Sequence, residues 1–212
     1  DYYAHPDCPE LPGELFGEKP LYVLCSHGHH DHFSKEILDF PEKYGAHLVL
    51  EEKVGEQAGR AGAAAAILGP GGHFDDGVIK IDAYGSTDEG ISFYIELDGT
   101  RLFHAGDLNN WHWQEESTKE EIEEARELFF AVLSVIAKEH PEMDVVFFPV
   151  DPRMVADIGR GAREFLIAVS CKTFVPMHFW GDFEAANAFE QEAVSRGARF
   201  VPLHHNGETF EL

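Results

Sequence analysis

The 212-residue sequence predicts a mixed α/β domain, the class in which strands and helices are both abundant along one chain. Short apolar runs rich in Val, Ile and Phe recur along the sequence, and longer amphipathic patterns lie between them. Gly-rich turns separate the two kinds of segment, and no repeat or linker divides the chain. A chain of this length can bury one sizeable core, so we expect residues 1–212 to form a single domain.

The strands are predicted from short runs of β-branched and aromatic residues that end at turn residues. Asp98-Gly99 separates two of these runs and predicts a hairpin. We assign no structure to 51–77, where the Ala63 to Ala66 run is compatible with a helix or a loop. The predicted strands are 21–25, 46–50, 78–84, 91–97, 101–104, 144–150, 173–177 and 199–203.

The clearest helical pattern covers 119–140, where apolar residues recur at spacings of three and four. Thr118 and Glu121 have the spacing of a capping box at its start, and Pro141 ends it after His140. Shorter helices are predicted after Ser34, over 160–170 and over 183–196.

Charge and cysteine content limit the partners and the compartment. The chain has 16 Lys and Arg against 39 Asp and Glu, a formal net charge of −23, which repels phosphate backbones and anionic membranes. We therefore expect no nucleic acid partner, and no window approaches the roughly 18 apolar residues of a membrane span. Cys8, Cys25 and Cys171 are too few and too scattered for a disulfide framework, which predicts a reducing, cytoplasmic location. The sequence leaves the oligomeric state open.

The strongest chemical signal is the segment His27-Gly28-His29-His30-Asp31-His32, directly after the apolar run 21–25. Imidazole nitrogens and carboxylates bind first-row metals, and a turn after a strand lets such side chains converge. Core packing does not explain this density of histidine, so the segment predicts a metal site. In an extended turn His27 and His29 would bind one ion and Asp31 and His32 a second, while His30 would face away toward solvent.

The sequence His27-x-His29-x-Asp31-His32 resembles the signature of the metallo-β-lactamase-fold hydrolases, in which a strand precedes the motif and a helix follows it. Leu102 to Asp107 resembles the family strand that supplies a bridging aspartate, and Phe174 to His178 the strand that supplies the last histidine. The resemblance implies a four-layer αβ/βα sandwich with the metals at one edge of its two sheets. Segments 85–90, 104–109 and 111–113 resemble the ascorbate-6-phosphate lactonase and phospholipase D-like branch.

Two positions depart from the family pattern. The family has a third-motif histidine where this chain has Gly85 to Gly90, a segment without histidine. Asp88 could replace it, or His104 could reach one ion from the neighbouring strand, and we favour His104. The first family motif is an aspartate after early strands. Asp1 resembles that residue, so we expect it to support the ligands. The strands that precede this aspartate in the family are absent from the sequence; either the domain lacks them or, more simply, the sequence is partial.

Together these motifs predict a dinuclear centre in which Asp107 lies between two ions. A divalent ion lowers the pKa of bound water from about 16 to about 7, so we expect hydrolysis by an activated water that Asp31 orients. Zinc suits the imidazole-rich ligand set, and manganese tolerates its carboxylates. The predicted catalytic residues are Asp31 and Asp107; the predicted ligands are His27, His29 and His104 for the first ion and Asp31, His32 and His178 for the second.

Two residues are weaker candidates for binding a small-molecule substrate. His112, between Trp111 and Trp113, could line the mouth of the site, although core packing explains the two indoles equally well. Arg153 follows the strand 144–150, and its planar guanidinium could bind a carboxylate or phosphate, although a surface ion pair is the simpler interpretation.

Three functions are compatible with this pattern. The leading hypothesis is a metal-dependent hydrolase of a small ester, lactone or phosphodiester. The alternative is a metal-binding protein of the same fold that has lost catalysis, because the third-motif histidine is absent. A di-iron redox protein is the third, but the resemblance places a glutamate in that branch where this chain has His29.

Overall fold

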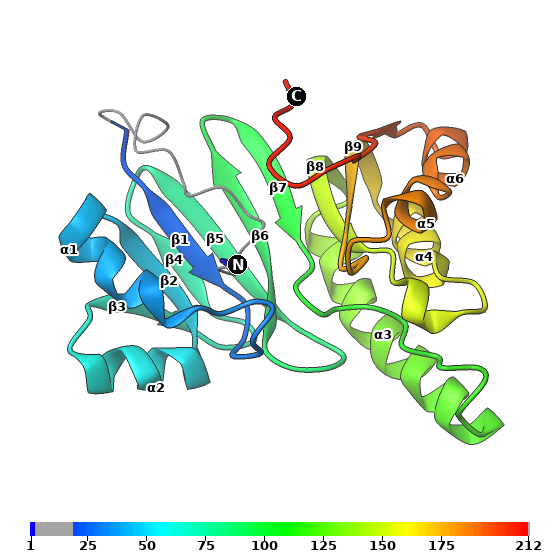
Figure 1. Cartoon of the computed structure of the whole chain (residues 1–212), viewed down its shortest axis with the longest axis horizontal. Coiled ribbons are helices and arrows are strands. Elements are labelled where there is room, and N and C mark those ends of the chain that lie inside the picture. The colour runs from blue at the N-terminus through cyan, green and yellow to red at the C-terminus, as the bar shows by residue number, and fades with distance from the viewer. Residues whose placement is uncertain (3–18, 212) are drawn as a thin grey trace.

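The computed structural model describes residues 1–2 and 19–211, which form two β-sheets with helices on the outer face of each (Figure 1). The strands are β1 (Tyr22–Cys25), β2 (His47–Glu51), β3 (Ala65–Leu68), β4 (His73–Asp75), β5 (Ile79–Gly85), β6 (Ile91–Leu97), β7 (Thr100–His104), β8 (Glu142–Pro149), β9 (Ser170–Met177) and β10 (Arg199–Phe200). The helices are η2 (Lys35–Asp39), α1 (Phe40–Tyr44), α2 (Glu52–Ala61), α3 (Lys119–Glu139), η3 (Pro152–Met154), α4 (Arg160–Ala168), α5 (Phe183–Asn187) and α6 (Glu190–Ser195).

The two sheets differ in size and in strand direction. The smaller sheet has the order β1-β2-β3 and is parallel throughout. The larger has the order β10-β9-β8-β7-β6-β5-β4, with antiparallel pairs from β4 to β7 and parallel pairs from β7 to β10. Parallel neighbours need long crossovers, and α3 provides the one between β7 and β8 while α4 provides the one between β8 and β9.

Three apolar cores separate four layers. Alternate residues of β5 point to opposite faces of the sheet: Ile81 packs with Val49 in the core between the two sheets, whereas Tyr84 packs with Phe129 of α3 in the core under the helices. A third core joins the smaller sheet to α1 and α2, where Val54 packs against the strands. The order helices, sheet, sheet, helices is the predicted four-layer αβ/βα sandwich.

Most predicted elements are confirmed, with shifts of one to three residues at their ends. The helix over 119–140 forms as α3, and the capping box of Thr118 and Glu121 is complete. The last residue of α3 is Glu139, and His140 caps the helix before Pro141. The segment 51–77, which received no assignment, contains α2, β3 and β4, so the Ala63 to Ala66 run leads into a strand.

Two predicted elements are shorter than expected. The helix predicted over 183–196 is wrong as a single unit, because Phe189 turns into the core beside Phe174 and separates α5 from α6. The strand predicted over 199–203 ends at Phe200, and Pro202 cannot donate a backbone hydrogen bond to extend the pairing. Among the described residues, no helix is both long and apolar enough to cross a membrane. Cys25 and Cys171 are buried free thiols, and Cys8 lies outside the described residues.

Candidate metal centre

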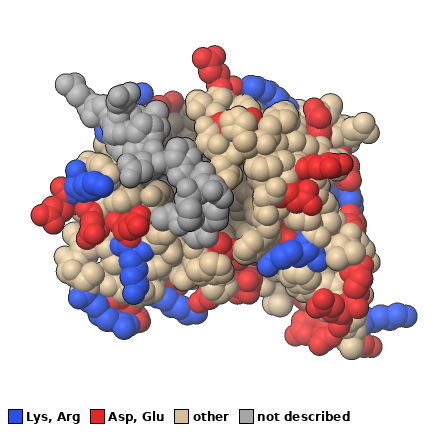
Figure 2. All heavy atoms as spheres, in the orientation of Figure 1, with Lys and Arg blue, Asp and Glu red and all other residues tan. Residues whose placement is uncertain are grey.

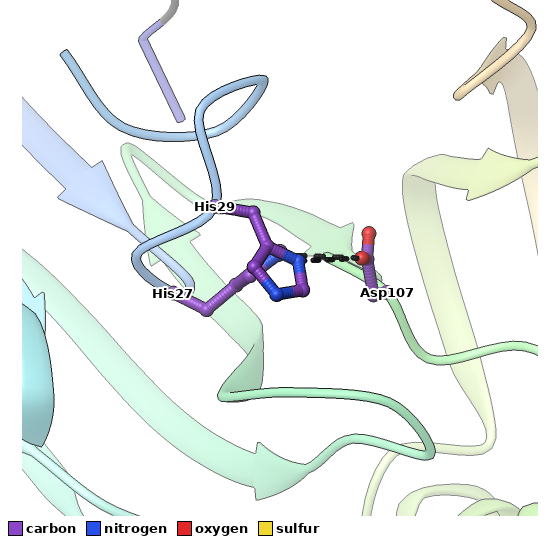
Figure 3. A group of neighbouring side chains, drawn as sticks. All are labelled: His27, His29 and Asp107. Atoms are coloured by element: carbon purple, nitrogen blue, oxygen red, sulfur yellow. Dashed lines mark hydrogen bonds and ion pairs between the residues drawn. The ribbon is translucent and has the colours of Figure 1, made fainter.

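Loops at the carboxyl ends of β1, β7 and β9 converge at one edge of the two sheets. They place six of the seven predicted ligands in two groups, and within each group the ligand atoms lie within 4.8 Å of one another. His27, His29 and Asp107 form the first group, which Figure 3 shows with both imidazoles directed toward the carboxylate. Asp31, His32 and His178 form the second. Residues up to 151 positions apart in the sequence therefore meet at this edge, since the groups extend from His27 to His178.

Asp107 lies between the two groups and turns one oxygen toward each. Its Oδ2 is 3.3 Å from His27 Nε2 and 4.0 Å from His29 Nδ1. Its Oδ1 is 3.0 Å from His32 Nε2 and 3.3 Å from His178 Nε2. The carboxylate is only 3% exposed, and no described residue hydrogen-bonds to its buried Oδ1. A buried carboxylate surrounded by imidazole nitrogens fits bound cations, since each of these nitrogens has a lone pair when the neutral ring carries its proton on the other nitrogen.

Asp1 orients one histidine of each group. Its Oδ2 is 2.8 Å from His32 Nδ1 and accepts a hydrogen bond of 2.8 Å from the Ser26 hydroxyl. The same hydroxyl lies 3.0 Å from Nδ1 of His27, and the backbone N–H of Ser26 donates to Asp1 Oδ1 at 2.6 Å. These contacts fix both rings so that Nε2 faces Asp107, which is the usual role of outer partners around a metal site.

The other two histidines have carboxylate partners of their own. Nδ1 of His178 lies 2.9 Å from Asp151 Oδ2, and Nε2 of His29 lies 2.9 Å from Glu89 Oε2. Each of these carboxylates is in turn paired with a cation, Asp151 with Arg153 at 2.6 Å and Glu89 with Lys53 at 2.5 Å. All four histidines of the two groups thus have one nitrogen toward Asp107 and the other on a fixed polar partner.

Charge within the centre favours ionised carboxylate. Burial disfavours ionisation of Asp107, but the imidazoles of His178, His27 and His32 outweigh burial and hold its pKa well below the usual range. Burial also lowers the pKa of His178, yet its contacts with Asp107 and Asp151 raise that pKa to about 9. In the metal-free protein His178 therefore holds a proton at neutral pH, and a bound ion must displace it.

Neither candidate for the missing histidine joins the first group. His104 accepts a hydrogen bond from the backbone of Gly106 through Nδ1, and its Nε2 lies 3.8 Å from Asp1. Burial lowers its pKa well below the ordinary value, so it is a neutral ring beside Asp1 and stands apart from both ligand groups. Asp88 is exposed and lines the neighbouring cavity. His30 is 80% exposed in its side chain, as its predicted outward orientation requires.

Sequence reasoning missed Glu89, which contacts His29 from the loop between β5 and β6. This loop is the segment where the expected histidine is absent, and Glu89 follows Asp88 directly. The available signal was a second carboxylate in that segment. The contact of Glu89 with His29 follows only from the structure, which places this loop beside the turn after β1.

The structure places the two substrate candidates differently. His112 is fully buried, and its Nε2 lies 3.5 Å from the backbone oxygen of Asp157, so the expectation that it lines the site is wrong. Arg153 does line a cavity of about 390 Å³ next to Asp107 and His178. A larger cavity of about 550 Å³, lined by Asp82 and other residues, does not include any residue of the two ligand groups.

No protein-family model matches the chain. The chain is similar to a UPF0173 metal-dependent hydrolase of Symbiobacterium thermophilum, with 26% identity over 225 residues that cover 99% of this chain and 88% of the relative. It is also similar to a UPF0173 metal-dependent hydrolase of Staphylococcus aureus, with 24% identity over 175 residues, 74% of this chain and 67% of that protein.

Solved structures share the arrangement of the layers. A metallo hydrolase from the archaeon Ignicoccus hospitalis has a TM-score of 0.66 and 20% identity, covering 94% of this chain and 84% of that one. The metallo-β-lactamase-fold protein YhfI from Bacillus subtilis has a TM-score of 0.60 and 15% identity, covering 93% and 82%. The diiron β-hydroxylase CmlA from Streptomyces venezuelae has a TM-score of 0.64 and 13% identity, covering 96% of this chain and 48% of that one.

Proposed function

The chain has the metallo-β-lactamase fold, and from its ligand geometry we propose that it is a metal-dependent hydrolase with two divalent ions. One observation supports the proposal most directly: the two oxygens of Asp107 face different histidine pairs, His27 with His29 and His32 with His178. A carboxylate in that position can bridge two ions, and paired ions roughly 3.5 to 4 Å apart are a common arrangement for hydrolysis.

The proposed ligand atoms follow from the orientation of each ring. Nε2 of His27, Nδ1 of His29 and Oδ2 of Asp107, the three atoms that face one another, would hold the first ion. Three protein ligands leave a position for water or substrate, which distinguishes a catalytic site from a closed structural one. Asp31, Nε2 of His32 and Nε2 of His178 would hold the second ion, together with Oδ1 of Asp107. Zinc suits this set, and manganese is the alternative.

The bound ions supply Lewis acidity and a water whose pKa is lowered to about 7. The chain supplies position and charge. Asp107 stays ionised and buried, so it contributes a fixed negative charge between the two ligand groups. Asp31 is the more accessible carboxylate, with a side chain 20% exposed, and its Oδ2 lies 3.6 Å from His32 Nε2 and 3.7 Å from His178 Nε2. It can therefore orient a water or accept its proton at the mouth of the site.

The proposed substrate is a small ester, lactone or phosphodiester, since the adjoining cavity of about 390 Å³ lies in the size range of small-molecule sites. Placement near the ascorbate-6-phosphate lactonase branch and in the cytoplasm remains a prediction from the sequence. The diiron neighbour shares the fold at 13% identity. The imidazole at position 29, set against Asp107, favours a hydrolytic centre over a di-iron one.

Metal counting combined with a substrate screen tests this function. Purified protein is loaded with zinc or manganese, the ions per chain are measured, and lactone phosphates, phosphodiesters, acyl thioesters and β-lactams are offered as substrates. Two ions per chain and turnover that a chelator abolishes support the hydrolase. His32→Ala should abolish both the two-ion metal content and the turnover. His205→Ala removes a histidine whose side chain is 71% exposed, and it should change neither the metal content nor the turnover.

The alternatives give different results in the same experiment. One tightly bound ion without turnover of any substrate class would favour a metal-binding protein that has lost catalysis. Iron in anaerobically purified protein, together with reduction of O2 or NO, would favour the redox function.

A further inference from the structure

All three tryptophans of the chain gather around one arginine beside the second ligand group. The guanidinium of Arg153 lies 4.6 Å from the ring centroid of Trp180 and 5.8 Å from that of Trp113. The rings of Trp111 and Trp113 stack at 5.7 Å with an interplanar angle of 9°. Trp111 and Trp180 also contact the ring of His178, with centroid distances of 5.6 and 5.7 Å. We call Trp111, Trp113 and Trp180 the aromatic wall; the guanidinium of Arg153 is the cation that lies against it.

The backbone around this wall is held in an unfavourable conformation. Trp113, Val155, His178 and Trp180 have φ angles of +38°, +55°, +61° and +53°, in the region that favours glycine. They are four of the six described non-glycine residues with positive φ. Bulky residues persist in that region only where the surrounding structure imposes it, and such positions cluster at ligand sites. The surrounding fold therefore fixes the positions of the residues at the aromatic wall.

Asp151 binds one edge of the Arg153 guanidinium, formed by Nε and Nη2, and the edge that carries Nη1 is left available. Its Nε lies 3.0 Å from both oxygens of Asp151, and its Nη2 donates to Asp151 Oδ2 at 2.6 Å. No described residue accepts a hydrogen bond from Nη1 of Arg153. Asp151 is fully buried and also holds Nδ1 of His178 at 2.9 Å. One carboxylate thus fixes a proposed metal ligand and the guanidinium at a constant separation.

The charges around the cavity favour anion binding at the Nη1 edge of Arg153. Arg153 is the only Lys or Arg among the described residues that line the cavity, whereas Asp88, Glu121 and Glu124 line it with carboxylates. Acidic side chains gather over the amino-terminal end of α3 (Figure 2). Most of this surface repels anions, so among the side chains that line the cavity the guanidinium is the group that stabilises an anion.

We propose that the substrate carries a carboxylate or phosphate, separate from the bond that is cleaved, and that Arg153 binds this group between Trp113 and Trp180. The planar guanidinium matches a carboxylate or phosphate oxygen pair, and the faces of Trp111 and Trp113 accept a flat or apolar body. The group is separate from the cleaved bond because Arg153 lies beyond His178, whereas Asp107 lies between the two ligand groups. The identity of the cleaved bond rests on the proposed function, but anion binding at Arg153 does not.

Tryptophan fluorescence tests the anion site without any turnover, because every tryptophan of the chain lies at this wall. The zinc-loaded protein is titrated with inorganic phosphate, with glutarate and with neutral dimethyl glutarate. We expect saturable changes with one or both anions and none with the neutral diester. Arg153→Met should weaken anion binding about tenfold or more, the scale of a lost charge-assisted hydrogen bond. Arg60→Met, at an exposed position of α2, removes the same charge elsewhere and should leave binding unchanged.

Equal affinity of the anions for wild type and Arg153→Met, at equal zinc content, would overturn the proposal. If Arg153→Met binds less zinc, Arg153→Lys serves instead. Its ammonium keeps the charge near Asp151 but lacks a second edge, so anion affinity should still fall, and unchanged affinity would again overturn the anion site. A response to phosphate alone or to glutarate alone identifies which anionic group the site accepts.

A matched pair of esters separates this proposal from the hydrolase itself. Mono-4-nitrophenyl glutarate carries a free carboxylate, and its methyl ester does not. Wild type should prefer the acid in kcat/KM, and Arg153→Met should lower that preference about tenfold, measured as the ratio of kcat/KM for the two esters at equal zinc content. Turnover of both esters without any such preference contradicts the anion site but not the hydrolase. Failure to hydrolyse either ester counts against the proposed function, and the fluorescence titration still decides the anion site.

Discussion

Nε2 of His29 lies 2.9 Å from Oε2 of Glu89, and Oε1 of the same carboxylate lies 2.5 Å from Nζ of Lys53. Glu89 belongs to the segment in which the third-motif histidine of the family is absent. The hydrogen bond from Lys53 is the main reason that the pKa of Glu89 is lowered, so this partner is an anion at neutral pH. An anionic partner on Nε2 of His29 keeps the proton there and leaves Nδ1 free to face Asp107.

We therefore expect Glu89→Gln to weaken binding of the first ion about 10- to 100-fold, the usual effect of removing an outer carboxylate from a ligating histidine. Chelator competition measures the two zinc affinities separately. Lys53→Met is the control, because Lys53 is 71% exposed and should alter zinc affinity only slightly. Wild-type affinity at both sites in Glu89→Gln would show that Glu89 has no part in orienting His29.

Asp107→Ala removes the carboxylate between the two groups. We expect the bound metal to fall from two ions to one or fewer and kcat/KM to fall about 100-fold or more, since both proposed ions lose a ligand. Metal analysis and turnover of the best substrate from the screen measure the two effects. Asp39→Ala, at an exposed position outside both groups, is the control. Full metal content with full turnover in Asp107→Ala would refute the bridging assignment.

His104→Gln distinguishes the sequence-based hypothesis from the observed placement. The sequence favoured His104 as a ligand of the first ion, whereas the structure sets it beside Asp1 and apart from both groups. We expect this variant to keep two ions per chain, with at most a modest loss of affinity through Asp1. Loss of one ion, with the fold intact by circular dichroism, would restore His104 to the ligand set.

The site was predictable where its residues are adjacent in sequence or stand at strand ends. His27 to His32 form one turn after β1, and the ends of β7 and β9 supply Asp107 and His178. The partners of these ligands were not predictable in the same way. Glu89 meets His29 from 60 positions away, and only the packing of the two sheets brings those loops together. The stacking of Arg153 on Trp180 likewise depends on loops that follow different strands.

Elements of the fold were likewise predictable when the signals for them lie within their own sequence, and not when they depend on distant residues. α3 was predictable because its capping box and apolar spacing lie within its own sequence. β3 and β4 were missed because an Ala- and Gly-rich segment has no period of its own, and their pairing with β2 and β5 determines their structure. The break between α5 and α6 follows from the burial of Phe189, which depends on the position of Phe174 in β9.

Phe165 of α4 should be a major source of stability. Its fully buried ring contacts Phe103 at 5.1 Å and Phe148 at 4.9 Å, so the helix is joined to β7 and β8 through one side chain. We expect Phe165→Ala to lower the free energy of unfolding by about 3 to 5 kcal/mol, measured by urea titration of metal-free protein. Ile167→Ala, on the same helix but 65% exposed, should cost less than about 1 kcal/mol. Similar losses in both variants would contradict this account of the core.

Asp144 should make stability depend on pH in the acid range. Hydrogen bonds from Arg101, then from Lys172, hold its pKa below the ordinary value, so the unfolded chain binds a proton more readily than the folded one. The ionised carboxylate therefore stabilises the fold above the unfolded pKa of about 4, and this contribution is lost as the pH falls through the lower folded pKa.

Asp144→Asn should cost about 1 kcal/mol at pH 7, and the difference from wild type should shrink in urea titrations below pH 4. Asp39→Asn makes the same chemical change at an exposed position and is the control. A constant difference between Asp144→Asn and wild type from pH 7 to pH 3 would mean that the charge of Asp144 does not stabilise the fold.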